Sequence, residues 1–332
     1  MSEPRDEAQQ VGGSALPGGV MMRTPTKVAL AVRHVDTGEI LTDSFEVKTP
    51  TGKWARWPLV RGVVALQTAL STGKRALSSS EDLRWSDTGE GDATDEPEDL
   101  GFWGKVLVAL SAVLGVAVQI AAFRIAPIVI AKEAGLTGAA FIVTDAVLRL
   151  GLLLTTLWVL SKFRPFRKIL SYHGAEHKAI AAHEAGHPLT ASAAAGFSRF
   201  HPRCGTSFLV VSAVVSIAVY GAVLAITGVF TYPALIATRL IGAPLVTAIA
   251  FEIQRQASKR AKGRWSFLSF PGVAAQRLTT AEPEHEDLEV ACTALKIALA
   301  PVSAIEEVRA KEADAAAASA LEPAEPQPSV SS

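Results

Sequence analysis

The sequence predicts a mainly α-helical, polytopic membrane protein with about four transmembrane helices. A small N-terminal β-hairpin and helix segment and several cytoplasmic helical segments complete the predicted fold. Three observations support this class. Mean hydropathy is +0.28 although both ends of the chain are polar, so the apolar residues are concentrated in blocks. Four of these blocks are long enough to cross a bilayer. Lys and Arg cluster beside some blocks and are scarce beside others.

Composition and charge limit the classes of function. The 332 residues carry 32 Lys and Arg against 32 Asp and Glu, so the formal net charge is zero. This balance argues against a global attraction to nucleic acid, and we expect no nucleic-acid partner. Cys204 and Cys292 are too few for a disulfide framework, and thiols on the cytoplasmic side stay reduced. The polar N-terminal stretch lacks the apolar core of a cleavable signal peptide.

The polar parts of the chain are divided by changes in composition. A β-hairpin is predicted within residues 28–47, because two β-prone runs flank a turn at Asp36–Glu39. A helix is predicted from Pro58, since proline suits a first turn. The predicted segments are a disordered lead (1–18), an N-terminal cytoplasmic α+β segment (19–80), an acidic linker (81–100), spans one and two (101–160), a cytoplasmic His-rich loop and helix (161–207), spans three and four (208–252), a cytoplasmic C-terminal segment (253–304) and a disordered tail (305–332).

The apolar cores of the four predicted spans are residues 103–123, 136–160, 208–230 and 232–251. The second contains Asp145 and Arg149, which are four residues apart and therefore share a helix face. Because an ion pair is costly in lipid, we expect this pair to face the interior of the bundle. Arg239 and Pro244 interrupt the fourth, which leaves a re-entrant segment as the alternative to a full span.

Flanking charges predict the orientation. Basic residues follow the second and fourth spans, namely Lys162, Arg164, Arg167, Lys168, Arg255, Lys259, Arg260, Lys262 and Arg264. By the positive-inside rule the 161–207 segment and both termini are cytoplasmic, in a multi-pass membrane protein. The expected partners are the lipid bilayer with its headgroups and a membrane partner protein, and the sequence leaves homo-oligomerisation open.

The motif HGAEH places two candidate metal ligands and a candidate general base within about one turn of a helix. His173 and His177 are four residues apart, so on a helix both can bind one divalent metal, most simply zinc. Glu176 lies between them, where a general base toward the metal site is needed.

A second motif, HEAGH, offers His183 and His187 as a competing pair. The two pairs start ten residues apart, about 15 Å along a helix, so they cannot share one ion. Gly186 and Pro188 predict that the helix ends within this motif, which disfavours the second pair.

A mononuclear site needs a third protein ligand, and the motif HPRC supplies two candidates. His201 and Cys204 precede the third span, on the same membrane face as HGAEH. Three alternatives stay open for this region. Pro202 and Gly205 can simply shape a turn, Cys204 can be a nucleophile activated by a histidine, or Glu252 at the end of the fourth span can be the ligand or base.

Several motifs together resemble the YqhQ-type bacterial membrane proteins, a family that carries a domain of unknown function. They are GGVMMRTP, ALAVRH, WPLVRGVVAL, YHGAEHKAI, HPRCGTSFLV, FEIQR and PGVAAQRLTTAEPEHEDLEVACTAL, which span nearly all of residues 17–300. The resemblance implies a metal-dependent enzyme and includes His173, Glu176, His177, His201 and Cys204, whereas HEAGH does not belong to it.

Further matching residues and one departure complete the resemblance. Arg23, Glu282 and Glu289 match the family, as does Arg61, which lies in an apolar helix and can bind an anionic group such as a lipid phosphate. The alternative for Arg61 is an arginine that reaches the membrane interface. The family's N-terminal motif usually has glutamate where this chain has Gly19, which puts in doubt any role of that carboxylate here.

The leading functional hypothesis is a metal-dependent enzyme, most plausibly hydrolytic, that acts at the cytoplasmic membrane face. Its ligands would be His173 and His177, completed by His201 or Cys204, with Glu176 as general base. A non-catalytic membrane scaffold or assembly factor is the first alternative. An oligomeric transporter or channel is the second, because of the Asp145–Arg149 pair.

Overall fold

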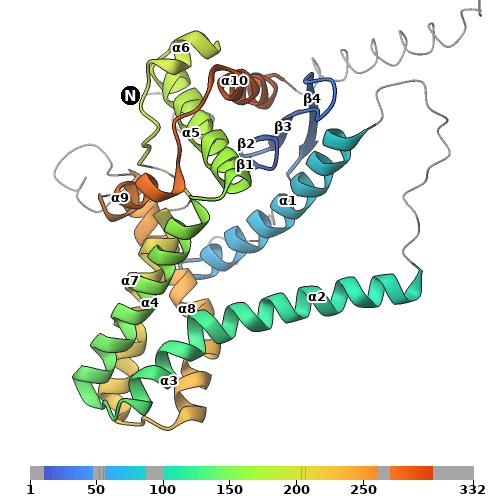
Figure 1. Ribbon diagram of the computed structural model, residues 1–332. Coiled ribbons are helices and arrows are strands. Elements are labelled where there is room, and N and C mark those ends of the chain that lie inside the picture. Colours follow the sequence, from blue (N-terminus) through green and yellow to red (C-terminus); the bar gives the residue numbers. More distant parts are fainter. Residues whose placement is uncertain are drawn as a thin grey trace, which may run out of the picture.

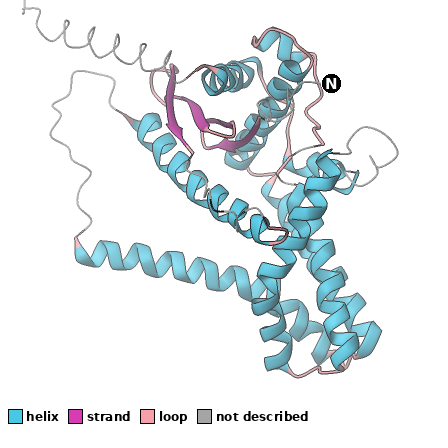
Figure 2. Ribbon diagram, turned by 180° about the vertical axis from the view of Figure 1, so that it is seen from behind, coloured by secondary structure: helices cyan, strands magenta, loops and turns pink. Residues whose placement is uncertain are grey.

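The structure, a computed structural model, describes residues 11–47, 52, 55, 57–86, 101–202, 204–205, 207–259 and 270–301 (Figure 1). It is mainly helical, with a small antiparallel sheet at one end and a bundle of apolar helices at the other. Two long helices, α1 (Val60–Trp85) and α5 (Arg164–Glu184), extend from the bundle to the sheet (Figure 2).

The sheet has four strands in the order β1-β2-β3-β4, each antiparallel to its neighbour. Their bounds are Gly12–Leu16 for β1, Gly19–Arg23 for β2, Lys27–Arg33 for β3 and Ile40–Glu46 for β4. The predicted hairpin in residues 28–47 is β3 and β4, with Gly38 in the turn at a φ of 72°. The prediction of a disordered lead over residues 1–18 is wrong for β1. This strand is ordered by pairing with β2, a contact that its short sequence GGSAL does not predict.

The linker prediction also needs correction at its start. Helix α1 continues to Trp85, so the first residues of the predicted 81–100 linker are helical. Residues 87–100 and the predicted tail over 305–332 lie outside the described residues.

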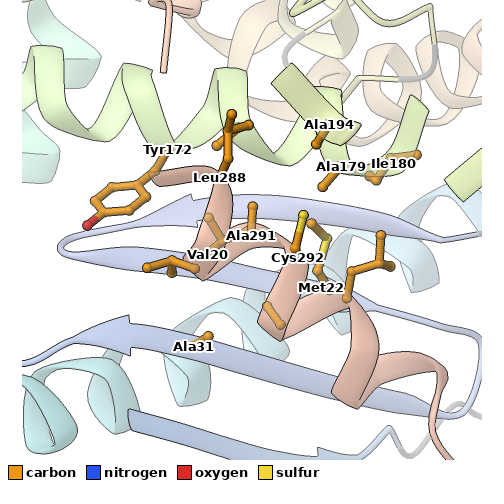
Figure 3. Packing of buried hydrophobic residues seen from close by; sticks show 14 of the residues in the cluster. Val20, Met22, Ala31, Tyr172, Ala179, Ile180, Ala194, Leu288, Ala291 and Cys292 are labelled. Carbon is orange, nitrogen blue, oxygen red and sulfur yellow. The ribbon is translucent and has the colours of Figure 1, made fainter. Parts of the chain in front are cut away.

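Alternate residues of the central strands face two different helical layers, as strand geometry requires. Val20 and Met22 of β2, with Ala29 and Ala31 of β3, pack against α5 and α10 (His285–Leu299), as Figure 3 shows for several of them. The residues between them, which include Leu30, face Ala76 of α1 on the other side. The sheet is therefore the middle of three layers.

The packing of α10 and α5 is close because small residues line both helices. Ala175 and Ala179 of α5 meet Ala291 and Cys292 of α10 in the same buried cluster, which the short helix α6 (Ala191–Ala195) extends. A capping box between Glu284 and the third helical residue fixes where α10 begins.

In the part of the chain that the structure describes, four helices are long and apolar enough to cross a membrane, as the sequence predicts. The first candidate span covers Phe102–Glu133, and comprises α2 (Phe102–Ile120), a π-helical turn (Ala121–Ile125) and α3 (Ala126–Glu133). The others are α4 (Gly138–Leu160), α7 (Ser207–Thr227) and α8 (Tyr232–Lys259). Helix α8 is continuous through Pro244, which favours a full span over the re-entrant alternative.

The first predicted apolar core ends at residue 123, but the helical structure continues to Glu133. The chain there forms the π-helical turn and then α3. Lys132 donates to the carbonyl of Phe230 at 2.6 Å, so it closes the end of the bundle. Helix α2 extends away from α4, α7 and α8 in both views (Figures 1 and 2).

Helix α1 ties the sheet to the bundle at one close crossing. At Gly62 an added Cβ would lie 2.9 Å from Cβ of Phe251 in α8, so the two helices touch with no room for a side chain. Next to this crossing the guanidinium of Arg61 forms two hydrogen bonds with the carboxylate of Glu252. The ion pair and the crossing together fix how α1 leaves the bundle.

Gly19 is required by the sheet itself. It lies opposite Val32, and an added Cβ would meet the carbonyl oxygen of Ala31 at 2.2 Å and Cα of Val32 at 2.8 Å. A carboxylate at this position would displace β3. The departure from the family's motif at position 19 therefore removes no side chain that this sheet could hold.

We predict that Gly19→Ala lowers the free energy of unfolding by about 1–3 kcal/mol, because the new methyl group overpacks β2 against β3. Thermal denaturation of the purified protein in detergent measures this. The control is Gly73→Ala in α1, where an added Cβ meets nothing within 4 Å. That substitution should be neutral or stabilising, as expected when alanine replaces a helical glycine. Equal melting temperatures for the two variants would contradict the prediction.

Candidate metal centre

Helix α5 presents HGAEH as one buried face. It begins after Phe163 with proline in its first turn, and Gly186 at a φ of 75° follows its end. His173, Glu176 and His177 are 8%, 4% and 1% exposed. Such burial is unusual for three ionisable side chains in one turn of a helix, and indicates that they have partners inside the fold.

The loop before α7 brings Cys204 to the two histidines. One ligand atom from each of His173, His177 and Cys204 lies within 4.8 Å of the other two. Nε2 of His173 lies 3.1 Å from Sγ of Cys204. Both imidazoles and the thiol are buried, and the two rings are 4.5 Å apart between centroids. Two nitrogens and one sulfur thus converge, which is a donor set that suits zinc.

Backbone carbonyls orient both imidazoles toward this point. Nδ1 of His173 lies 2.6 Å from the carbonyl oxygen of Thr279, at the end of α9 (Phe270–Thr279). Nδ1 of His177 lies 2.5 Å from the carbonyl oxygen of Arg199. A carbonyl oxygen only accepts, so each Nδ1 carries the proton and donates, and each Nε2 has a lone pair. This is the outer contact that ligand histidines make in metal sites.

The Nε2 atom of His177 is buried and has no hydrogen-bond partner among the described residues. A buried acceptor without a partner is costly, and its lone pair is directed by the contact of Nδ1 with Arg199. A metal ion at the point shared with His173 and Cys204 would satisfy it.

Glu176 lies beside the cluster and packs against β1. An added Cβ on Gly13 would meet Cδ of Glu176 at 2.8 Å, so only glycine leaves room for this carboxylate. Burial raises the pKa of Glu176 to about 7, although the neighbouring imidazole of His173 and the backbone amide of Gly13 oppose the rise. One oxygen, Oε2, is buried and has no partner among the described residues. A carboxyl with such a pKa can take up or release a proton at neutral pH.

His201 lies next to the cluster but is not one of its three members. Its ring centroid is 5.8 Å from that of His177, and its Nε2 is 3.5 Å from Oε2 of Glu184. The side-chain amide of Gln276 in α9 holds the backbone of His201, with hydrogen bonds of 2.8 Å to its nitrogen and 2.7 Å to its oxygen. Of the two residues predicted to complete the ligand set, the structure brings Cys204 into place.

Among the residues that the structure describes, the motif HEAGH contributes no side chain to a potential metal-binding cluster. Helix α5 ends at Glu184, so His183 lies in its last turn and His187 lies beyond it. His187 is exposed and its ring packs on Phe197, 5.2 Å between centroids. The helix end that Gly186 and Pro188 predict is confirmed.

Arg61 and Glu252 form an ion pair with each other. Their bidentate ion pair, about a quarter exposed on each side chain, differs from both roles suggested for them by sequence. Arg61 does not present its guanidinium to an outside anion, and Glu252 lies in α8 outside the His–His–Cys cluster. The pair contributes to the helix crossing instead.

Other matching charged residues support the site from outside. Lys178 of α5 is buried and its ammonium binds Glu282 and the carbonyl oxygen of Ala195. Glu282 also lies 3.5 Å from Arg199, whose carbonyl orients His177. Glu289 of α10 pairs with Arg33 of β3 at 3.4 Å. The sequence alone does not indicate the roles of Lys178, Gln276 and Gly13, because these roles depend on contacts between distant segments.

The comparisons with known proteins identify a family but not an activity. The family described as "Protein of unknown function (DUF1385)" matches residues 57–301. The uncharacterized protein YqhQ of Bacillus subtilis (strain 168) is 31% identical over 294 residues, which cover 84% of this chain and 89% of that protein. No solved structure matches.

We predict that Gln276→Ala loosens the loop that carries Cys204, although the substitution alters none of the three candidate ligand residues. The backbone N–H and C=O of His201 lose their partners, which should lower the free energy of unfolding by about 1–3 kcal/mol. Alkylation of Cys204, followed by peptide mass spectrometry, should become faster. Gln67→Ala, at an exposed position of α1, is the control and should change neither quantity. Unchanged alkylation of Cys204 in Gln276→Ala would contradict the prediction.

Proposed function

The chain belongs to the family of proteins of unknown function DUF1385, and from this membership and the site geometry we propose that it is a metal-dependent membrane enzyme. His173, His177 and Cys204 hold one divalent cation, and their donor set suits zinc. The reaction is hydrolytic and takes place at the cytoplasmic face of the bacterial inner membrane.

One observation carries this proposal: two buried imidazoles, each with Nδ1 fixed by a backbone carbonyl, present Nε2 to the same point as a buried thiol. Purely structural histidines have no reason to share this arrangement. Three protein ligands are also the number found in catalytic zinc sites, where a fourth position stays open to water or substrate. The bound cation would supply Lewis acidity toward that water and the substrate.

The residues around the site support roles in hydrolysis. Glu176 is suited to accept a proton from the attacking water and to return it to the leaving group, because its pKa is raised to about 7. The burial of the cluster keeps bulk water out and strengthens electrostatic interactions there. Thr279 and Arg199 position the imidazoles through their carbonyls and take no part in proton transfer.

The location follows from the helices beside the site. Helix α5 begins four residues after α4 ends, and α7 begins three residues after Cys204, so the site lies at one end of the candidate spans. Basic residues follow α4 at this end, which favours the cytoplasm for the site and for both termini. We therefore infer that the bilayer is the main partner and that substrates reach the site at the membrane surface.

The contact of 3.1 Å between Cys204 and His173 favours a second candidate function. A thiol beside an imidazole that is oriented by a third group is the arrangement of a cysteine nucleophile and its base. In that case His173 takes the thiol proton, and the site works without a metal. Metal analysis separates the two candidates.

We predict that the purified full-length protein binds about one zinc ion per chain, because three ligands converge on one point. His173→Ala, His177→Ala and Cys204→Ala should each abolish stoichiometric binding, measured by inductively coupled plasma mass spectrometry after dialysis. His183→Ala and His187→Ala are the matched controls and should keep the metal. Wild-type protein without a bound metal, but with Cys204 readily alkylated, would favour the thiol nucleophile.

We predict that Glu176→Gln keeps the metal and the fold but loses function, since the amide fills the same space and cannot act as a base. The measurements are zinc content, melting temperature and complementation of a deletion strain. Complementation equal to wild type would exclude an enzymatic role for Glu176. That result would favour a scaffold or assembly factor.

A further inference from the structure

The candidate spans enclose a second group of buried polar residues, far from HGAEH in sequence. The carboxylate of Asp145 in α4 accepts hydrogen bonds from Arg149, one turn later, and from Arg239 in α8, at 2.7 Å. Arg149 also donates to Oγ of Ser216 in α7 at 2.9 Å. Three helices therefore meet at these charges, and the pair predicted from sequence acquires a third member.

The charges in this group do not balance. Both guanidinium groups use the same oxygen, Oδ2 of Asp145. Arg124, at the π-helical turn, adds a third positive charge and donates to the carbonyl oxygen of Arg239 at 3.3 Å. Three guanidinium charges against one carboxylate leave a net charge of +2. Uncompensated charge is expensive between apolar helices.

The polar atoms are also incompletely paired. Nη1 of Arg239, Nε of Arg149 and Oδ1 of Asp145 are buried and have no hydrogen-bond partner among the described residues. The side chains of Arg239 and Asp145 are 4% and 5% exposed, and that of Arg149 is 14% exposed. The ring of Tyr220 lies 5.6 Å and 5.3 Å from the two guanidinium groups, which offsets only part of the charge.

The helix ends add to the positive potential. Asp145 and Arg239 each lie seven residues after the start of their helix, Gly138 for α4 and Tyr232 for α8. Both helices begin at the same end of the bundle, about 10 Å from these residues. Their N-terminal ends carry partial positive charge, so nothing in these two helix starts neutralises the arginines.

We propose that Arg149 and Arg239 form a binding site for a phosphate-type oxyanion inside the helical bundle, apart from the proposed metal centre. The anion neutralises the excess charge and accepts the N–H groups that lack partners. Guanidinium groups suit this ligand because their donors match the oxygens of a phosphate. Asp145 holds both arginines in place and competes with the anion for them. The site stands whether or not the metal centre binds zinc.

The phosphate group can come from free phosphate or from a lipid headgroup, and two arms of one experiment distinguish them. The full-length protein in phosphatidylcholine nanodiscs is titrated with inorganic phosphate by isothermal calorimetry at low ionic strength. In parallel, protein from nanodiscs that contain phosphatidylglycerol is analysed by native mass spectrometry for retained lipid. Saturable binding of phosphate indicates a soluble anion, and one retained anionic lipid per chain indicates a headgroup. Either result supports the site.

Substitutions of the arginines and of Asp145 should change the affinity for phosphate or anionic lipid in opposite directions. Arg239→Gln should weaken binding of phosphate or anionic lipid about tenfold or more, and Arg149→Lys should weaken it less, because it keeps the charge but loses the planar donors. Asp145→Asn should tighten binding about tenfold, since it removes the competing carboxylate. Arg61→Gln, which alters an arginine already paired with Glu252, is the control and should bind as wild type.

The proposal is overturned if folded wild-type protein neither binds phosphate nor retains anionic lipid. It is also overturned if Arg61→Gln and Arg239→Gln weaken binding equally, because binding would then reflect general surface charge. If Arg239→Gln fails to fold, the tightening expected in Asp145→Asn and the weakening expected in Arg149→Lys still decide the matter. Weaker binding in Asp145→Asn would contradict the competition on which the site rests.

Discussion

The candidate metal centre depends on the packing of α5 against the sheet and α10. Residues advance by about 100° around a helix axis, which places Ala175, Ala179 and Ala182 on the face opposite His173 and His177. The alanines are completely buried in the core cluster, where small side chains let the neighbouring elements approach closely. This contact fixes the rotation of α5 about its axis. The histidines must then point away from the sheet, toward α9 and the loop that carries Cys204.

A second set of close contacts holds the facing side. Gly174 lies where an added Cβ would meet the carbonyl oxygen of Ala281 at 2.2 Å, so the segment after α9 crosses α5 directly. The backbone of Leu170 accepts a hydrogen bond from Ala281 at 2.8 Å in the same crossing. Helix α9 is thereby held beside His173, and its last carbonyl reaches Nδ1. The glycine of HGAEH is thus as necessary for the site as the histidines around it.

The sequence reveals the ligands of this site better than their surroundings. His173 and His177 are predictable, because four-residue spacing places them on one face of any helix, and Gly186 marks the helix end. The choice between His201 and Cys204 is not predictable, since it depends on how Gln276 holds the loop. The carbonyls that orient the rings carry no sequence signal at all. Strand β1 is missed for a similar reason, because its order comes from pairing with β2 and from the contact of Gly13 with Glu176.

The sequence positions of the candidate ligands and of the carbonyls that orient them determine the order in which the cluster can assemble. His173 is separated from the carbonyl of Thr279 by 106 residues, and the candidate spans α7 and α8 lie between them. Closing such a contact is slow compared with closing local ones. During synthesis, His173 emerges well before the segment that sets its tautomer. The ribosome therefore completes α7 and α8 before the carbonyl of Thr279 can orient His173, so full assembly of this cluster is a late event in the synthesis of the chain.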